Sequence, residues 1–149
     1  MAVEHILALA TDEPLDKIMH QWFKDIKYST EIKKESYTNG MYAEHPYFSM
    51  SGIIYQNPKW KSKRYDFQPN IIITFRLLPH GENSKLALDI IKKGTIKRLE
   101  ASNNPLTLVV YDDTWILSYK NNEIIIDPNW WSDEELEPLS LDVRKQKLS

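Results

Sequence analysis

The side chains with the widest catalytic repertoire in this 149-residue chain are its four histidines, His5, His20, His45 and His80. None of them lies three or four residues from another, which is the spacing that brings two metal ligands onto one face of a helix. The chain has no cysteine, so thiolate metal sites and cysteine nucleophiles are excluded. From these patterns we predict no metal site, no cofactor and no catalytic residue.

Two pairs of identical acidic residues stand out as candidates for chemistry, Asp112–Asp113 and Glu134–Glu135. The first pair separates two apolar runs, where short acidic side chains suit a hairpin turn. The second pair follows Ser132 with capping-box spacing, and acidic residues are stabilised at the positive end of a helix. Glycosidase-type acid–base catalysis needs two carboxylates at a set separation across a cleft, which a sequence does not test. We therefore interpret both pairs as structural.

One segment, Lys59–Tyr65, interleaves basic and aromatic residues. Cations for phosphates and rings for bases are the features that bind single-stranded nucleic acid. The whole chain carries a formal net charge of -2 and offers no matching basic stripe elsewhere, so we expect no nucleic acid as a partner. The segment suits an acidic protein surface equally well. Nucleic-acid binding through Lys59–Tyr65 stays open as an alternative.

Length indicates one domain over residues 1–149, with a polar tail from about 139 to 149 that we expect to fray. Hydrophobic residues make up 42% of the chain and charged residues 27%, a balance typical of folded proteins. The amino-terminal apolar run stops at Ala10 and lacks a basic region, unlike a signal peptide. No stretch approaches the ~20 apolar residues of a spanning helix. We expect a cytoplasmic protein without a membrane partner.

Hydrophobic periodicity predicts the first two elements. Residues Val3–Ala10 alternate as in a strand, and Thr11 or Asp12 then suits a helix cap ahead of Pro14. Apolar residues recur on one face of the helix that follows, at Leu15, Ile18, Met19, Trp22, Phe23 and Ile26.

A second helix is predicted to begin at a cap at Ser84 and to end in the turn residues Ser102–Pro105. Gly94 inside it costs about 1 kcal/mol relative to alanine, which close approach to a neighbouring backbone would explain. Three strands joined by tight turns follow, at Leu106–Tyr111, Thr114–Tyr119 and Ile124–Ile126.

The stretch between Tyr28 and Gln68 is rich in aromatic residues and broken by turn signals. We predict two or three short strands in it, two of them at Glu31–Tyr37 and Phe48–Tyr55, and a central strand after it at Asn70–Leu78. The fold class is therefore α+β: an antiparallel sheet of about five to seven strands, with two amphipathic helices packed on one face, ending in a three-strand meander.

The order of these segments resembles a known family. The resemblance lies in Val3–Thr11 before an amphipathic helix, Ile73–Leu77, Leu108–Asp113, Trp115–Leu117 and a last strand before Trp130 and Trp131. The chain is similar in these parts to the Sit-type immunity proteins, antidotes encoded beside polymorphic contact-delivered bacterial toxins. It differs in its longer aromatic stretch, and in Asn121 and Asn122 where we expect turn glycines. The resemblance implies no enzymatic activity and direct binding of a cognate protein toxin.

Aromatic side chains dominate the energetic centres of protein interfaces. As partner-binding residues we predict those of the aromatic stretch, namely Tyr37, Tyr42, Tyr47, Trp60 and Tyr65. We interpret Trp130 and Trp131 as packing residues, one at the edge of the core and one over a helix end. The acidic stretch 127–142 is a second candidate face. A small enzyme with an unrecognised pocket is the other alternative.

Overall fold

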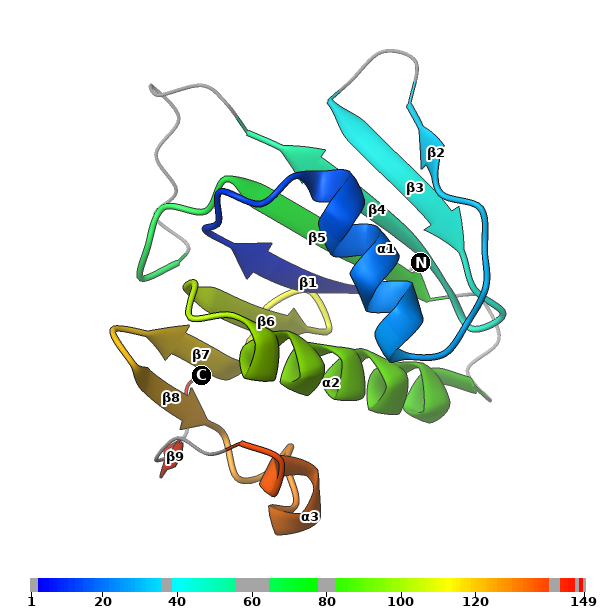
Figure 1. Ribbon diagram of the computed structural model, residues 1–149. Coiled ribbons are helices and arrows are strands. Elements are labelled where there is room, and N and C mark those ends of the chain that lie inside the picture. Colours follow the sequence, from blue (N-terminus) through cyan, green and yellow to red (C-terminus); the bar gives the residue numbers. More distant parts are fainter. Residues whose placement is uncertain are drawn as a thin grey trace.

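The computed structural model describes residues 3–35, 39–55, 65–77, 83–139, 143–146 and 148. Within these residues the chain forms one mixed sheet of nine strands (Figure 1). The strands are β1 (Glu4–Leu9), β2 (Lys33–Lys34), β3 (Gly40–Glu44), β4 (Phe48–Ile54), β5 (Ile71–Leu77), β6 (Leu106–Val110), β7 (Thr114–Lys120), β8 (Glu123–Ile126) and β9 (Val143–Lys145). Their spatial order is β2-β3-β4-β5-β1-β6-β7-β8-β9. Neighbours are antiparallel except β8 and β9, which are parallel.

The α+β class is confirmed, whereas the prediction of an antiparallel sheet of five to seven strands is wrong. The position of β3 was not predicted, because Asn39 and Gly40 indicate a turn, yet Gly40 begins the strand. The strand predicted at Glu31–Tyr37 reduces, within the described residues, to the two lysines of β2. A two-residue edge strand carries too little apolar pattern to be recognised from sequence.

β9 is the strand that makes the sheet mixed, and it lies in the tail that we predicted to be polar and frayed. Its backbone pairs with β8, and the Gln146 amide extends the ladder by donating to the Ile126 carbonyl. Two ion pairs accompany this ladder, Arg144–Glu123 at 3.2 Å and Lys145–Asp133 at 2.7 Å. No hydrophobic alternation announces such a strand, because its pairing depends on backbone groups.

Helices α1 (Leu15–Asp25) and α2 (Ser84–Ala101) cover one face of the sheet, and a four-residue helix α3 (Asp133–Leu136) lies beside the end of the meander (Figure 1). The predicted apolar face of α1 is confirmed for five of its six residues, since Leu15, Ile18, Met19, Trp22 and Phe23 are buried. Ile26 is the C-cap residue and is half-buried. Among the described residues, no helix is both long enough and apolar enough to cross a lipid bilayer.

The predicted side-chain caps of α1 and α2 are wrong. Pro14 occupies the N-cap of α1 and makes no side-chain bond, while the Thr11 hydroxyl accepts from the Glu13 amide at 3.2 Å. Asn83 occupies the N-cap of α2, and Ser84 is its first helical residue. The capping box at α3 is confirmed, because Ser132 and Glu135 bond each other's backbone amides.

Gly94 is explained by a side chain rather than by the neighbouring backbone that we expected. A Cβ atom at this position would lie 2.4 Å from Cζ2 of Trp22 and 2.6 Å from Cη2. The indole is buried, with 3% of its surface exposed, and packs 5.2 Å from the Phe75 ring. Gly94 therefore sets how closely α2 approaches α1.

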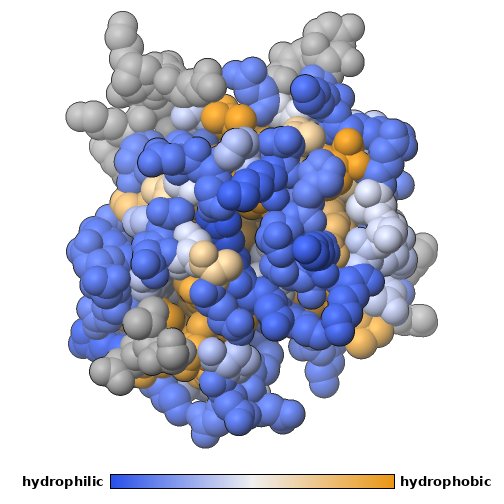
Figure 2. All heavy atoms as spheres, in the orientation of Figure 1, coloured by the Kyte–Doolittle hydropathy of each residue, from blue (hydrophilic) through white to orange (hydrophobic). Residues whose placement is uncertain are grey.

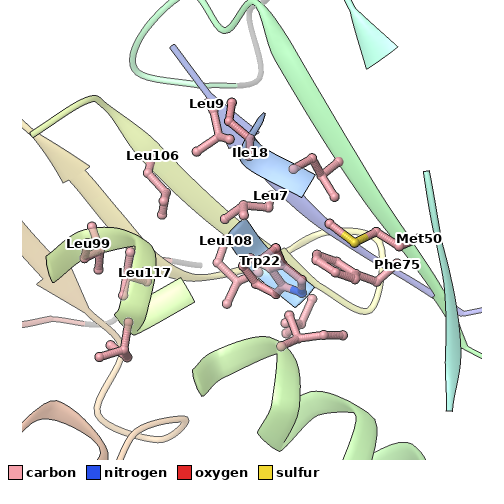
Figure 3. Close-up of a cluster of buried hydrophobic side chains, with 14 of the residues drawn as sticks. Leu7, Leu9, Ile18, Trp22, Met50, Phe75, Leu99, Leu106, Leu108 and Leu117 are labelled. Carbon is pink, nitrogen blue, oxygen red and sulfur yellow. The ribbon is translucent and has the colours of Figure 1, made fainter. Parts of the chain in front are cut away.

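The core lies between the two long helices and the sheet. Leu7 and Leu9 of β1 point into it with Phe75 of β5 and Leu108 of β6, and Trp22 meets them from α1 (Figure 3). Because successive strand residues point to opposite sides, the residues between these lie on the other face of the sheet.

The three-strand meander of β6, β7 and β8 is confirmed, as are its turns. Residues Tyr111–Asp113 join β6 to β7, so the first acidic pair lies in a hairpin turn as predicted. Asn121 and Asn122 join β7 to β8 with φ of +53° and +63°. Asparagine tolerates this left-handed region, which explains how the turn forms without glycine.

Candidate binding surface

The face of the sheet opposite α1 and α2, called the open face below, holds two of the predicted partner-binding residues. Strand register places one row of side chains across it from β3 to β7: Tyr42, Ser51, Thr74, Ile6, Val109 and Trp115. The members from β1, β3, β4, β5 and β6 alternate with core residues on their strands, and Val109 is itself fully buried. Trp115 follows a shift in the β6–β7 register, after which Ile116 and Leu117 both face the core. The fold thus lines up aromatic, aliphatic and small polar groups that are far apart in sequence.

Tyr42 lies at one end of this row. Its side chain is 37% exposed, while Met41 and Ala43 on either side of it are buried. Lys33 of β2 is its register partner, and the Lys33 ammonium lies 5.9 Å from the centre of the tyrosine ring. An exposed aromatic ring beside a cation, such as Tyr42 beside Lys33, is a group that a partner can cover.

Tyr65 lies at the other end, against Trp115. The two rings stack with centres 5.9 Å apart and planes at 24°. The Lys120 ammonium donates to the Asp66 carbonyl at 2.6 Å, which fixes the segment carrying Tyr65 on β7. Trp115 was not predicted as a binding residue. Its place two residues after the Asp112–Asp113 turn is the one feature of the sequence that could have drawn attention to it.

Tyr47 belongs to a different cluster, at the turn between β3 and β4. Its amide donates to Nδ1 of His45 at 3.1 Å, and the two rings lie 5.4 Å apart. The imidazole in turn stacks on Phe48 at 4.4 Å, and burial lowers the His45 pKa. Tyr47 is half-buried against the core. Tyr37 and Trp60, the remaining two predicted residues, lie outside the described residues.

Charges on the open face are mixed in the described residues. Its basic residues are Lys33, Arg76, Lys120 and Arg144, and its acidic residues are Glu4, Glu44 and Glu123. Nucleic-acid binding usually needs a continuous basic stripe. The described part of this face holds no such stripe, and Lys59–Arg64 lie outside it.

The opposite, helix-covered side is mainly hydrophilic, with apolar residues in separate small groups (Figure 2). It holds a groove of about 580 Å³ between α2 and residues 131–138. Lys92 is buried at its floor, with its ammonium 2.7 Å from Oε2 of Glu135 and 5.0 Å from the Trp131 ring. Burial raises the Glu135 pKa, but hydrogen bonds from Lys92 and Ser132 outweigh it and leave the pKa below its ordinary value.

Both carboxy-terminal tryptophans pack against the protein. The Trp131 indole donates to the Ile116 carbonyl at 2.8 Å and is 7% exposed. Trp130 is half-buried and lies 5.8 Å from the Tyr111 ring. The interpretation of these residues as packing residues is consistent with both positions.

A polar cluster surrounds Thr11 at the end of β1. Its hydroxyl accepts from Nδ2 of Asn104 at 2.8 Å, and its backbone forms two bonds with the Asn70 side chain. Arg98 pairs with Glu13 beside it, and this guanidinium holds the Glu13 pKa below its usual value. Because these groups already bond one another, we interpret the cluster as a link between α1, α2 and the strand ends. No group of three His, Asp or Glu residues in the described ranges is arranged to hold a metal ion.

Comparisons with protein-family models, with curated proteins and with solved structures found no match for this chain.

Proposed function

We propose that this protein is a non-catalytic binding protein whose open face is covered by a protein partner. The observation that carries the proposal is the row from Tyr42 on β3 to Trp115 on β7, which has an aromatic residue at each end. Protein interfaces combine aromatic anchors with a polar surround. The mixed charges of the open face suit such a surround better than they suit a polyanion.

We further propose that the partner is a bacterial toxin, which the protein neutralises by direct binding. This step is supported by the family resemblance of the segments Val3–Thr11, Ile73–Leu77 and Leu108–Asp113. An immunity protein of this kind needs a large complementary surface and no reaction chemistry. A standard interface buries roughly 800 Å² on each partner.

The test is co-expression with the product of the neighbouring reading frame, the expected toxin gene. We expect that product to arrest growth of a host cell alone and to be harmless when this chain is co-expressed. Purified together, the two proteins should form a stable complex in size-exclusion chromatography. A neighbouring product that neither harms the host nor binds this chain overturns the proposal.

Tyr42→Ala tests the open face itself. Tyr42 is exposed and outside the core, so the variant should fold normally while its affinity for the toxin falls roughly tenfold. Leu86→Ala is the matched control, because Leu86 is 47% exposed but lies on α2, on the other side of the sheet. Equal binding by both variants assigns the contact elsewhere.

Trp60→Ala tests the predicted anchor outside the described residues, where we expect weaker binding at an unchanged melting temperature.

A further inference from the structure

The turn between β6 and β7 presents an aromatic residue in a backbone conformation that suits other residue types. Tyr111 has φ of +50° and Asp112 has φ of +70°. The turn between β7 and β8 has the same left-handed pair, filled by Asn121 and Asn122. Asparagine populates this region readily, whereas a bulky aromatic residue does so at a cost. Turn stability alone would therefore favour asparagine at position 111.

Three hydrogen bonds fix the turn against the start of β1. The Asp112 amide donates to the Glu4 carbonyl at 3.0 Å, and the Glu4 amide donates to Oδ1 of Asp112 at 3.3 Å. The Tyr111 amide donates to Nδ1 of His5 at 3.0 Å. His5 is fully buried, and its ring meets the Tyr111 ring edge-on at 4.9 Å. These contacts hold the tyrosine in one position.

The tyrosine is nevertheless 41% exposed. A ring that is already fixed loses little conformational freedom when a partner covers it, which makes it an efficient anchor. Trp130 lies 5.8 Å away and extends the aromatic surface. Asp112 and Asp113 are exposed beside it, and Asp113 forms no ion pair with any residue of the described ranges.

We infer that Tyr111 is a preformed anchor for a protein partner whose contacting surface is positively charged. Asp112 and Asp113 attract that surface and hold it around the ring, because opposite charges across an interface raise the association rate and fix its register. The inference rests on the proposed function, since it assigns a contact and a charge to the same toxin. It places this contact at the end of the sheet where β1 begins.

Tyr111→Asn tests the anchor by giving this turn the residue type of the neighbouring one. We expect a melting temperature within about 3 °C of the wild type, because relief of the backbone strain offsets the lost ring contacts with His5 and Trp130. Affinity for the purified neighbouring-frame product should fall tenfold or more, measured by titration calorimetry. Asn121→Tyr is the matched control: it should lower the melting temperature and leave the affinity unchanged.

Asp113→Lys tests the charge of the partner. At low ionic strength the association rate with the same product should fall several-fold, and the difference from wild type should narrow as salt is added. An equal or faster association of the variant contradicts a positively charged partner surface.

The remaining outcomes separate this inference from the proposal beneath it. If the wild type binds the neighbouring product and Tyr111→Asn binds it equally well, the anchor is wrong and the proposed function stands. A loss of affinity that merely follows a lower folded fraction assigns Tyr111 to folding and also overturns the anchor. If the wild type does not bind that product, both the proposed function and the inference fail.

Discussion

At Gly94 two opposing effects of a single methyl group can be compared. Alanine would improve helix propensity by about 1 kcal/mol. Against this, its Cβ would meet three atoms of the Trp22 indole at 2.4 to 2.7 Å. The indole is a rigid, buried ring, so overpacking of this kind costs about 1–3 kcal/mol or more.

We therefore expect Gly94→Ala to lower the free energy of unfolding by about 1–2 kcal/mol, measured by urea denaturation. Gly52→Ala is the control, because its Cβ would meet the ends of flexible side chains, Leu15 and Met19. It should cost less than Gly94→Ala. A Gly94→Ala variant as stable as the wild type would contradict the packing argument.

Among the elements, α3 is the one whose helical conformation rests most clearly on its cap. Four residues are too few for a helix to be stable by propensity. The Ser132 hydroxyl accepts from the Glu135 amide at 3.2 Å, and Oε1 of Glu135 accepts from the Ser132 amide at 2.9 Å. The same carboxylate pairs with buried Lys92, so the cap also orients α3 against α2.

Ser132→Ala should lower the free energy of unfolding by about 1 kcal/mol, because it leaves the Glu135 amide without its acceptor. Amide hydrogen exchange at Glu135 should accelerate in the same variant. Ser132→Thr keeps the hydroxyl and should restore most of both properties. If alanine and threonine have equal effects, the capping box does not stabilise α3.

Elements with their own periodicity or turn chemistry could be predicted from the sequence. The apolar face of α1, the β6–β8 meander and the Ser132 capping box all follow local rules that the structure obeys. β3 and β9 could not be predicted, because their pairing partners are set by tertiary contacts and their own residues carry weak patterns. The row of side chains on the open face could not be predicted for the same reason. Tyr42 and Trp115 belong to one row only because of the register of the strands between them.

For the whole molecule, buried His5 makes stability depend on pH. Burial lowers its pKa from 6.5 to about 4 in the folded protein. Between these values the unfolded chain binds the proton more readily than the folded chain does, so stability falls as the pH drops from about 6.5 to about 4. A shift of this size corresponds to a loss on the order of 3 kcal/mol.

His5→Asn is the test, since asparagine offers an acceptor to the Tyr111 amide but does not titrate. The variant should be less stable than the wild type at pH 7, yet lose less stability between pH 6.5 and 4.5 in denaturant titrations. His45, whose pKa burial also lowers, leaves a residual slope in this range. Carboxylates with lowered pKa, such as Glu13 and Glu135, lose their contribution at lower pH. Parallel slopes for variant and wild type would assign the acid sensitivity to other groups.

The parallel pairing of β9 has a consequence for the meander. β8 carries three consecutive isoleucines, and without a neighbour its outer backbone groups would be a template on which strands of other molecules could assemble. β9 pairs with these backbone groups of β8, and it is a short strand whose arginine and lysine are exposed. Truncating the chain before Val143 would therefore expose β8 as an unpaired edge strand, and we expect the truncated protein to aggregate more readily than the full chain.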